Sequence, residues 1–165
     1  MQPGLYDDVH AALHAARVRY VVVGGTAVVL QGHARMTLDL DLVIDLAEPQ
    51  ARAAMAAITS TGMLPRLPVA AEDFADAELR RDWHENRNLL VFSFYDPASP
   101  LREVDVFVEE PVPFDELYDE ADVVRIGEVP VRVASVRHLI HMKTEAGRPV
   151  DLQDVAVLRE ISGER

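Results

Sequence analysis

The sequence predicts an α/β fold, of the α+β kind, with a mixed β-sheet flanked by helices and a helical C-terminus. Three observations favour this class. Apolar residues recur at helical spacing near the N-terminus, β-branched runs alternate with alanine-rich segments through the middle, and paired strand segments precede two final helical segments. The 165 residues are enough for one hydrophobic core, so we expect a single domain over residues 1–165.

The first elements alternate between helix and strand. Leucine, valine and alanine spacing predicts an amphipathic helix over residues 5–17. A β-branched strand over residues 20–23 ends at Gly24-Gly25, and helix-compatible residues follow from Thr26 to Gln31. The pattern predicts a strand, a tight turn and a helix.

The next strand, residues 38–44, alternates Leu and Asp before it becomes wholly apolar, as expected of a strand that starts at a cleft and runs into a core. Alanine-rich residues 48–61 predict a helix closed by Gly62, and the charged segment 71–81 predicts another. The rest of the chain is predicted to form two hairpins and two helices: strands 88–95 and 103–108, strands 123–126 and 129–133, and helices 136–145 and 152–161.

Composition excludes several classes of site. The chain has no cysteine, which excludes disulfides, thiolate metal sites and cysteine nucleophiles. It shows no signal-peptide pattern and no apolar run near the roughly 18 residues that a membrane span needs, so we expect a cytoplasmic protein with no membrane partner. A net charge of −12 disfavours nucleic acid as a partner unless basic residues gather locally or a cation screens the acids.

Three carboxylates are the strongest chemical signal. Side chains two apart on a strand share a face, so Asp39 and Asp41 are expected to be neighbours, while Leu38, Leu40 and Leu42 face the core. Repulsion between the two acids would be relieved by a divalent cation.

A third carboxylate could come from a neighbouring strand, on which Glu103, Asp105 and Phe107 share a face. Mg²⁺, or Mn²⁺, is bound by carboxylate and phosphate oxygens, so Asp39, Asp41 and Asp105 are candidate metal ligands. Asp105 could also act as the base for an attacking hydroxyl.

An alternating Leu-Asp-Leu-Asp strand is equally typical of a half-exposed edge strand. Gly24-Gly25 favours the metal site, because a glycine turn at a helix N-terminus lets backbone N–H groups approach phosphate oxygens. The chain has neither a G-x-G-x-x-G nor a P-loop segment, so Rossmann and P-loop interpretations are excluded.

Two stretches of the sequence resemble the nucleotidyltransferase superfamily, which includes DNA polymerase β-like enzymes, and look most similar to its AbiEii-type proteins. The residues that carry the resemblance are Val23-Gly24-Gly25-Thr26-Ala27, Gly32, Arg35, Thr37 and Asp39-Leu40-Asp41-Leu42, then Leu139-Ile140-His141-Met142-Lys143, Ala146-Gly147-Arg148-Pro149 and Asp151-Leu152-Gln153-Asp154.

The resemblance implies a role for each matching position. Gly24 and Gly25 would contact a triphosphate, Asp39 and Asp41 would bind metal, and Asp105 would complete the triad. Lys143 resembles a further triphosphate contact. Gly-Gly-Thr stands where the commoner pattern has Gly-Ser, so the serine contact is missing unless Thr26 supplies it.

Two basic residues near these positions allow two interpretations. Arg35 could direct positive charge toward a phosphate, beside a hydroxyl donor from Thr37, or it could pair with an Asp and hold the loop. The same alternatives apply to Arg148. Asp151 is expected to cap the last helix and Asp154 to be a first-turn acid.

The implied reaction transfers a nucleoside monophosphate from an NTP to a hydroxyl and releases pyrophosphate. The acceptor could be tRNA or another RNA, a protein or a small molecule such as an antibiotic, and the chain could be the toxin of a toxin–antitoxin pair with a cognate antitoxin. The competing hypothesis is a non-catalytic module of the same fold that binds a nucleotide or a partner protein.

The histidine pairs His10/His14 and His138/His141 share helix faces, but without a third ligand they are expected to be surface or packing residues rather than a zinc site. Trp83 is expected in the core.

Overall fold

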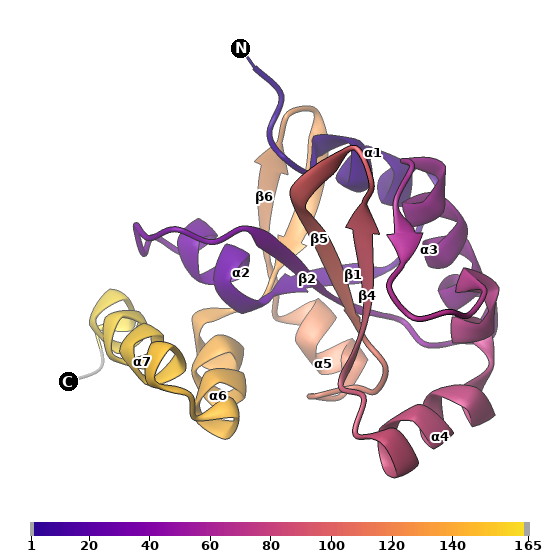
Figure 1. Ribbon diagram of the computed structural model, residues 1–165. Helices are drawn as coiled ribbons and strands as arrows, with labels where there is room; N and C mark the ends of the chain where they lie inside the picture. Colours follow the sequence, from indigo (N-terminus) through magenta and orange to yellow (C-terminus); the bar gives the residue numbers. More distant parts are fainter. Residues whose placement is uncertain (1, 164–165) are drawn as a thin grey trace.

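The computed structural model describes residues 2–163, and a mixed sheet of seven strands runs through them in the order β3-β4-β5-β2-β1-β7-β6 (Figure 1). The strands are β1 (Tyr20–Val23), β2 (Asp39–Ile44), β3 (Leu64–Pro65), β4 (Val91–Asp96), β5 (Ser99–Phe107), β6 (Asp122–Ile126) and β7 (Val129–Val133). The helices are α1 (Asp7–Ala15), α2 (Gly24–Leu30), α3 (Glu48–Ser60), the 3₁₀ helix η1 (Ala71–Ala75), α4 (Ala77–Arg87), α5 (Phe114–Asp119), α6 (Val136–Ala146) and α7 (Pro149–Ser162).

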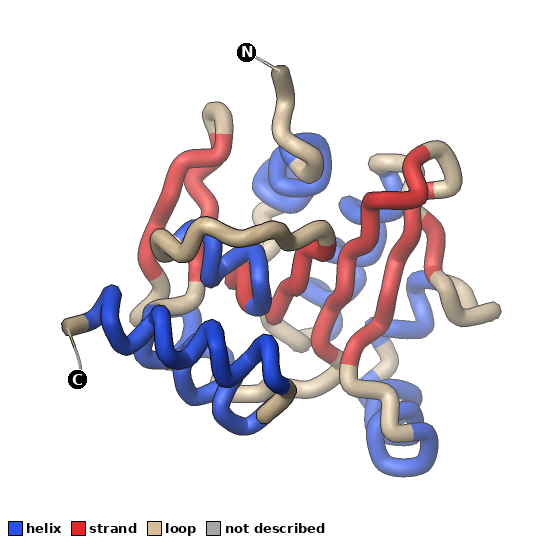
Figure 2. Tube along the Cα trace, turned by 60° about the vertical axis from the view of Figure 1, so that its left-hand side comes forward, coloured by secondary structure: helices blue, strands red, loops and turns tan. Residues whose placement is uncertain are grey.

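The helices form two groups around the sheet. α3 contacts α1, η1 and β2, whereas α6 pairs with α7 and contacts α2. Figure 2 shows the α6–α7 pair lying beside α2 and the loop that leads into β2, apart from the α1 and α3 helices. No helix among residues 2–163 is both long enough and apolar enough to span a membrane.

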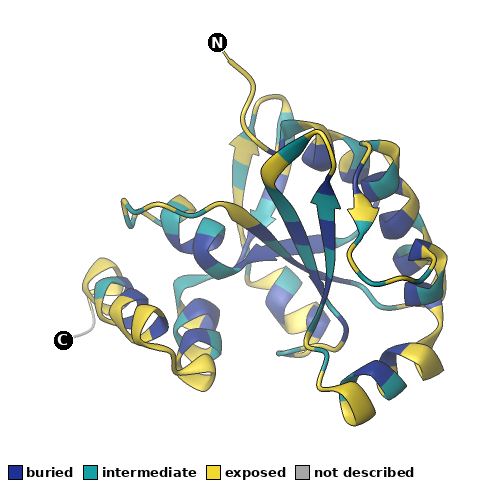
Figure 3. Cartoon of the chain, in the orientation of Figure 1, coloured by how far each residue is buried: buried dark blue, intermediate teal, exposed yellow. Residues whose placement is uncertain are grey.

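Strand alternation separates a packed face of the sheet from a partly open one. Leu40, Phe92, Phe94 and Val104 are fully buried on the packed face, while the residues between them along β4 and β5 are only half-buried (Figure 3). Trp83 is buried against the same core, with its ring 5.5 Å from that of Phe92. Burial of these large side chains is the main force that fixes the strand register.

The predicted fold class is confirmed, and both predicted hairpins are present as β4–β5 and β6–β7. The two central strands also lie where the sequence places them. β2 begins at Asp39 rather than Leu38, and Leu38 is 44% exposed, so the expectation that it faces the core was wrong.

Two helix predictions need correction. The helix expected over residues 71–81 is two elements, because the Asp76 carboxylate accepts the N–H groups of Glu78 and Leu79 and so starts a new helix. The last helix begins at Pro149, since proline is well accommodated at a first helical position. Asp151 is therefore the third helical residue rather than the N-cap residue, but it still caps the helix as expected, because its carboxylate accepts the backbone N–H of Arg148, the N-cap.

Two short elements were not predicted at all, the helix α5 and the two-residue strand β3. Helix α2 also starts directly at Gly24, with no intervening turn after β1.

Candidate active site

Four carboxylates lie together on the open face of the sheet. Parallel strands β2 and β5 are in a register that places Asp39 opposite Glu103 and Asp41 opposite Asp105. Neighbouring strands are about 4.8 Å apart, so the two pairs form a compact acidic cluster. The structure thus brings the three predicted carboxylates together and adds Glu103, whose position two residues before Asp105 was the available sequence signal.

The cluster makes ionisation of its members unfavourable. Burial, followed by the charges of Asp105 and Asp39, raises the pKa of Asp41 to about 7, although Lys143 and Arg148 act in the opposite direction. Burial is also the largest cause of the raised pKa of Asp105 and of Asp39, and the charge of Glu103 adds to both.

The acidic cluster fits a divalent cation. Asp105 Oδ1 is buried and has no hydrogen-bond partner among the described residues. An unpaired buried acceptor beside further carboxylate oxygens is a set of hard oxygen donors, which Mg²⁺ and Mn²⁺ prefer. Such an ion would remove the repulsion that raises the pKa values of these acids.

Close approach of neighbouring atoms requires glycine at both positions 24 and 25, and the backbone conformation requires it at position 24 as well. Gly24 has a φ of +67°, and a Cβ atom there would overlap the Asp41 carboxylate. A Cβ atom on Gly25 would lie 2.6 Å from Thr37 Oγ1 and 2.9 Å from an Arg35 guanidinium nitrogen. The absence of both side chains lets the loop before β2 fold over the start of α2, which exposes backbone to the cavity beside the acids.

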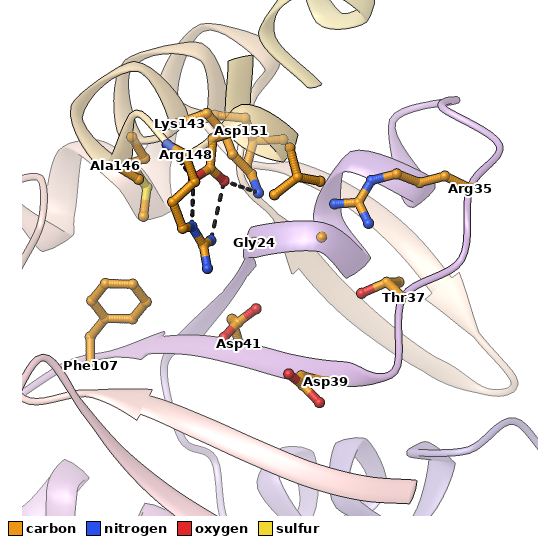
Figure 4. A pocket seen from close by; sticks show the side chains of 14 residues that line it. Gly24, Arg35, Thr37, Asp39, Asp41, Phe107, Lys143, Ala146, Arg148 and Asp151 are labelled. Carbon is orange, nitrogen blue, oxygen red and sulfur yellow. Dashed lines mark hydrogen bonds and ion pairs between the residues drawn. The ribbon is translucent and has the colours of Figure 1, made fainter. Parts of the chain in front are cut away.

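That cavity, which we call the first hollow, has a volume of about 280 Å³. It separates the β1–α2–β2 segment from the α6–α7 helices (Figure 4). Its polar lining comprises Gly24, Gly25, Arg35, Thr37, Asp39, Asp41, Lys143, Arg148 and Asp151.

A network of ion pairs joins the two walls of the first hollow. Lys143 Nζ lies 3.0 Å from Asp151 Oδ1 and 3.1 Å from Asp154 Oδ2, and Arg35 makes a bidentate pair with Asp154 at 2.8 Å for each bond. Arg148 binds Asp151 through Nε at 2.7 Å.

Ion pairing within this network outweighs the effect of burial on the pKa values of its two acids. Burial opposes ionisation of Asp151, but hydrogen bonds from Arg148 and Lys143 outweigh it and lower its pKa to about 2. The pKa of Asp154 is also lowered, because its bonds to Arg35 and Lys143 outweigh burial.

These contacts correct the expectation for Asp154 and show what else Arg35 and Lys143 bind. Asp154 is not a first-turn acid but a buried partner of two cations. Arg35 pairs with it and holds the loop, while still lining the first hollow, so the two interpretations of Arg35 are compatible. Lys143 also lines the first hollow, but its ammonium group is already bound by two carboxylates.

Thr26 is directed away from the first hollow. Its hydroxyl donates to the Asp39 carbonyl oxygen at 2.8 Å, and the residue is not part of the cavity lining. The side chain therefore secures the start of β2.

A second hollow, of about 830 Å³, adjoins the first. The two share Asp41, Phe107, Met142, Ala146 and Arg148. The second hollow also contains Asp105 and is lined further by Leu90, Val91, Pro111, His141 and Glu145. Asp41 thus stands where the two hollows meet.

The histidines belong mostly to packing and ion pairs. His10 is buried and bonds the Tyr20 hydroxyl at 2.9 Å. His138 is buried beside Glu116 and Glu120. One potential ligand atom from each of these residues lies within 4.8 Å of the others, close enough for a shared metal ion. The Arg137 guanidinium already binds both glutamates, so this group is satisfied as an ion-pair cluster.

Neither a protein-family model nor a curated protein matches the chain. Among solved structures, it is similar to the crystal structure of an antigenic nucleotidyltransferase-like protein from Paracoccidioides brasiliensis. The TM-score is 0.50 at 16% sequence identity, and the match covers 97% of this chain and 79% of that one. The fold is nucleotidyltransferase-like. At this level of identity the likeness concerns the arrangement of the sheet and helices, not the roles of individual residues.

Proposed function

We propose that this chain is a metal-dependent nucleotidyltransferase, most similar to the AbiEii type, which moves a nucleoside monophosphate from an NTP to a hydroxyl and releases pyrophosphate. The observation that carries the proposal is the acidic cluster beside Gly24-Gly25, on a nucleotidyltransferase-like fold. We place this activity in the cytoplasm, where NTPs and Mg²⁺ are abundant.

Different residues would bind the metal and the triphosphate. Asp39, Asp41 and Asp105 would hold Mg²⁺ or Mn²⁺, which when bound would neutralise phosphate charge and polarise the reacting phosphoryl group. The backbone at Gly24-Gly25 leaves room for phosphate oxygens, and Arg148 adds positive charge across the first hollow.

Asp105 suits the role of general base. It lies opposite Asp41 on the neighbouring strand β5 and lines the second hollow, close to where the two hollows meet. It would accept the proton of the acceptor hydroxyl as that oxygen attacks.

One observation favours the alternative of a non-catalytic module. The ammonium group of Lys143 is bound by Asp151 and Asp154, so a triphosphate would have to compete with two carboxylates for it. A module of the same fold could bind a nucleotide or a partner protein without turnover.

We propose three classes of acceptor: tRNA or another RNA, a protein, or a small molecule such as an antibiotic. If the chain is a toxin, its expression in bacteria arrests growth, a neighbouring gene encodes the cognate antitoxin, and Asp41→Asn removes the arrest. Normal growth with soluble wild-type protein would argue against the toxin role.

Calorimetry separates the enzyme from the module. We expect each NTP that binds to do so only with Mg²⁺ or Mn²⁺, and Asp41→Asn to abolish that binding. Asp119→Asn is the matched control, because Asp119 is exposed and makes no ion pair among the described residues. Release of pyrophosphate from labelled NTP with an RNA, protein or small-molecule acceptor supports the enzyme. Tight binding without turnover across all three supports the module, and no binding contradicts both.

A further inference from the structure

The second hollow has a different chemistry from the first. The lining of the first hollow is mainly glycine backbone, cations and acids. The second hollow is richer in apolar side chains, namely Leu90, Val91, Phe107, Pro111 and Met142, beside the polar residues Asp41, Asp105, His141, Glu145 and Arg148. Its volume of about 830 Å³ lies within the usual range for small-molecule sites, roughly 300 to 1,000 Å³. The two hollows adjoin, because they share Asp41 and Phe107 from the sheet and Met142, Ala146 and Arg148 from the helical side.

Phe107 lies at the point where the lining changes. It follows Asp105 by two residues on β5, so both side chains project from the open face, and its strand partner is Val91. Figure 4 shows its ring beneath Ala146 of α6, on the side of Asp41 away from Gly24. The ring lines both hollows, between sheet and helix.

This arrangement matches the two halves of a nucleoside triphosphate. A polyanion belongs beside Gly24-Gly25 and the cations, and a flat aromatic base belongs against an aromatic ring and aliphatic walls. Because one molecule carries both halves, the two hollows must be continuous, and they share Asp41 and Phe107.

The open face continues beyond Asp105 onto β4, where Ser93 lies opposite Asp105 and Tyr95 opposite Glu103. Arg66 pairs there with Glu103 at 3.1 Å and lies over the Tyr95 ring, so this surface is more polar than the second hollow. An acceptor hydroxyl that approached Asp105 from β4 would not have to pass the Phe107 ring.

We infer that Phe107 is the stacking platform for the nucleobase of the bound NTP, and that the second hollow is the nucleoside subsite. The inference rests on the proposed NTP binding. The polar residues His141, Glu145 and Arg148, which also line it, would then meet the base edge or the sugar.

The experiment compares NTPs with inorganic tripolyphosphate, which lacks a nucleoside. Binding of both is measured by calorimetry with Mg²⁺ for the wild type, Phe107→Leu and Phe107→Tyr. Leucine keeps an apolar side chain but has no ring, whereas tyrosine keeps the ring. Tyr118→Leu is the control, because Tyr118 is a half-buried aromatic residue on α5 that lines neither hollow.

We expect the best NTP to bind more tightly than tripolyphosphate, and Phe107→Leu to weaken the NTP by about fivefold or more, the lower end of the contribution of base–aromatic stacking. Tripolyphosphate affinity should stay unchanged, and Phe107→Tyr and Tyr118→Leu should resemble the wild type. Equal wild-type affinity for NTP and tripolyphosphate would overturn the nucleoside subsite while leaving triphosphate binding intact. Equal weakening of both ligands by Phe107→Leu would assign the ring a structural role and also overturn it. If neither the NTP nor tripolyphosphate binds, the proposed function itself is overturned.

Discussion

Replacing Asp41 by Asn should stabilise the metal-free protein at alkaline pH. The pKa of Asp41 is raised from 3.8 to about 7 by burial and by its acidic neighbours. The folded state therefore binds a proton more tightly than the unfolded state does. The free energy of unfolding therefore falls as pH rises from 3.8 to about 7, and the full loss of stability caused by the ionised Asp41 is present above about pH 7.

The magnitude follows from the two pKa values. At about 1.4 kcal/mol for each tenfold change in the protonation equilibrium, a rise from 3.8 to about 7 corresponds to at most about 4 kcal/mol. Asp41 is not fully buried, so solvent screening lowers this value. We expect Asp41→Asn to raise the free energy of unfolding by about 1 to 3 kcal/mol at pH 8, and by much less at pH 4.

Urea unfolding in the presence of EDTA measures the effect. Trp83 is the only tryptophan and is buried, so its fluorescence reports loss of the core. Asp119→Asn serves again as the exposed control. Adding Mg²⁺ at pH 8 should stabilise the wild type and leave Asp41→Asn unchanged. A destabilised Asp41→Asn at pH 8, or a stabilisation that does not decline toward pH 4, would refute the electrostatic reasoning.

Further predictions concern the glycine at the start of α2 and the ion-pair network. In urea unfolding, Gly24→Ala should destabilise the protein by at least about 1 kcal/mol more than Gly127→Ala. Both glycines have positive φ, but only Gly24 has a side chain, that of Asp41, within 4 Å of an added Cβ atom. Equal losses of stability in the two variants would exclude the clash with Asp41. Asp154→Asn should lower the free energy of unfolding by about 3 kcal/mol at pH 7, against less than about 0.5 kcal/mol for the exposed pair member Glu48→Gln. Because pairing lowers the pKa of Asp154, its contribution is present above pH 3.8 and lost as pH falls further, so an effect that persists unchanged at lower pH would contradict the pairing.

The sequence predicted most of the central sheet because the relevant signals are local. Alternation in residues 38–44 and 103–107 indicates which side chains of β2 and of β5 share a face, and the parallel register of the two strands places Asp105 opposite Asp41. The short elements were missed because α5 has six residues and β3 has two, too few for a period to be visible.

The ion-pair network was beyond sequence reasoning because its partners are distant along the chain. Arg35 and Asp154 are separated by 119 positions, and nothing local shows that α7 packs beside the loop before β2. The role of Asp154 was therefore mistaken for a local helix effect. Thr26 likewise bonds Asp39, a contact that depends on the path of the intervening loop.

The central claim is that Asp39, Asp41 and Asp105 hold a divalent metal that binds an NTP. Its most direct test is a crystal structure with Mn²⁺ and a non-hydrolysable NTP, in which anomalous scattering locates the metal. We predict a Mn²⁺ peak in contact with these carboxylates and with the triphosphate beside Gly24-Gly25. A peak only at Glu116, Glu120 and His138, or no metal at the acidic cluster despite bound nucleotide, would contradict the claim.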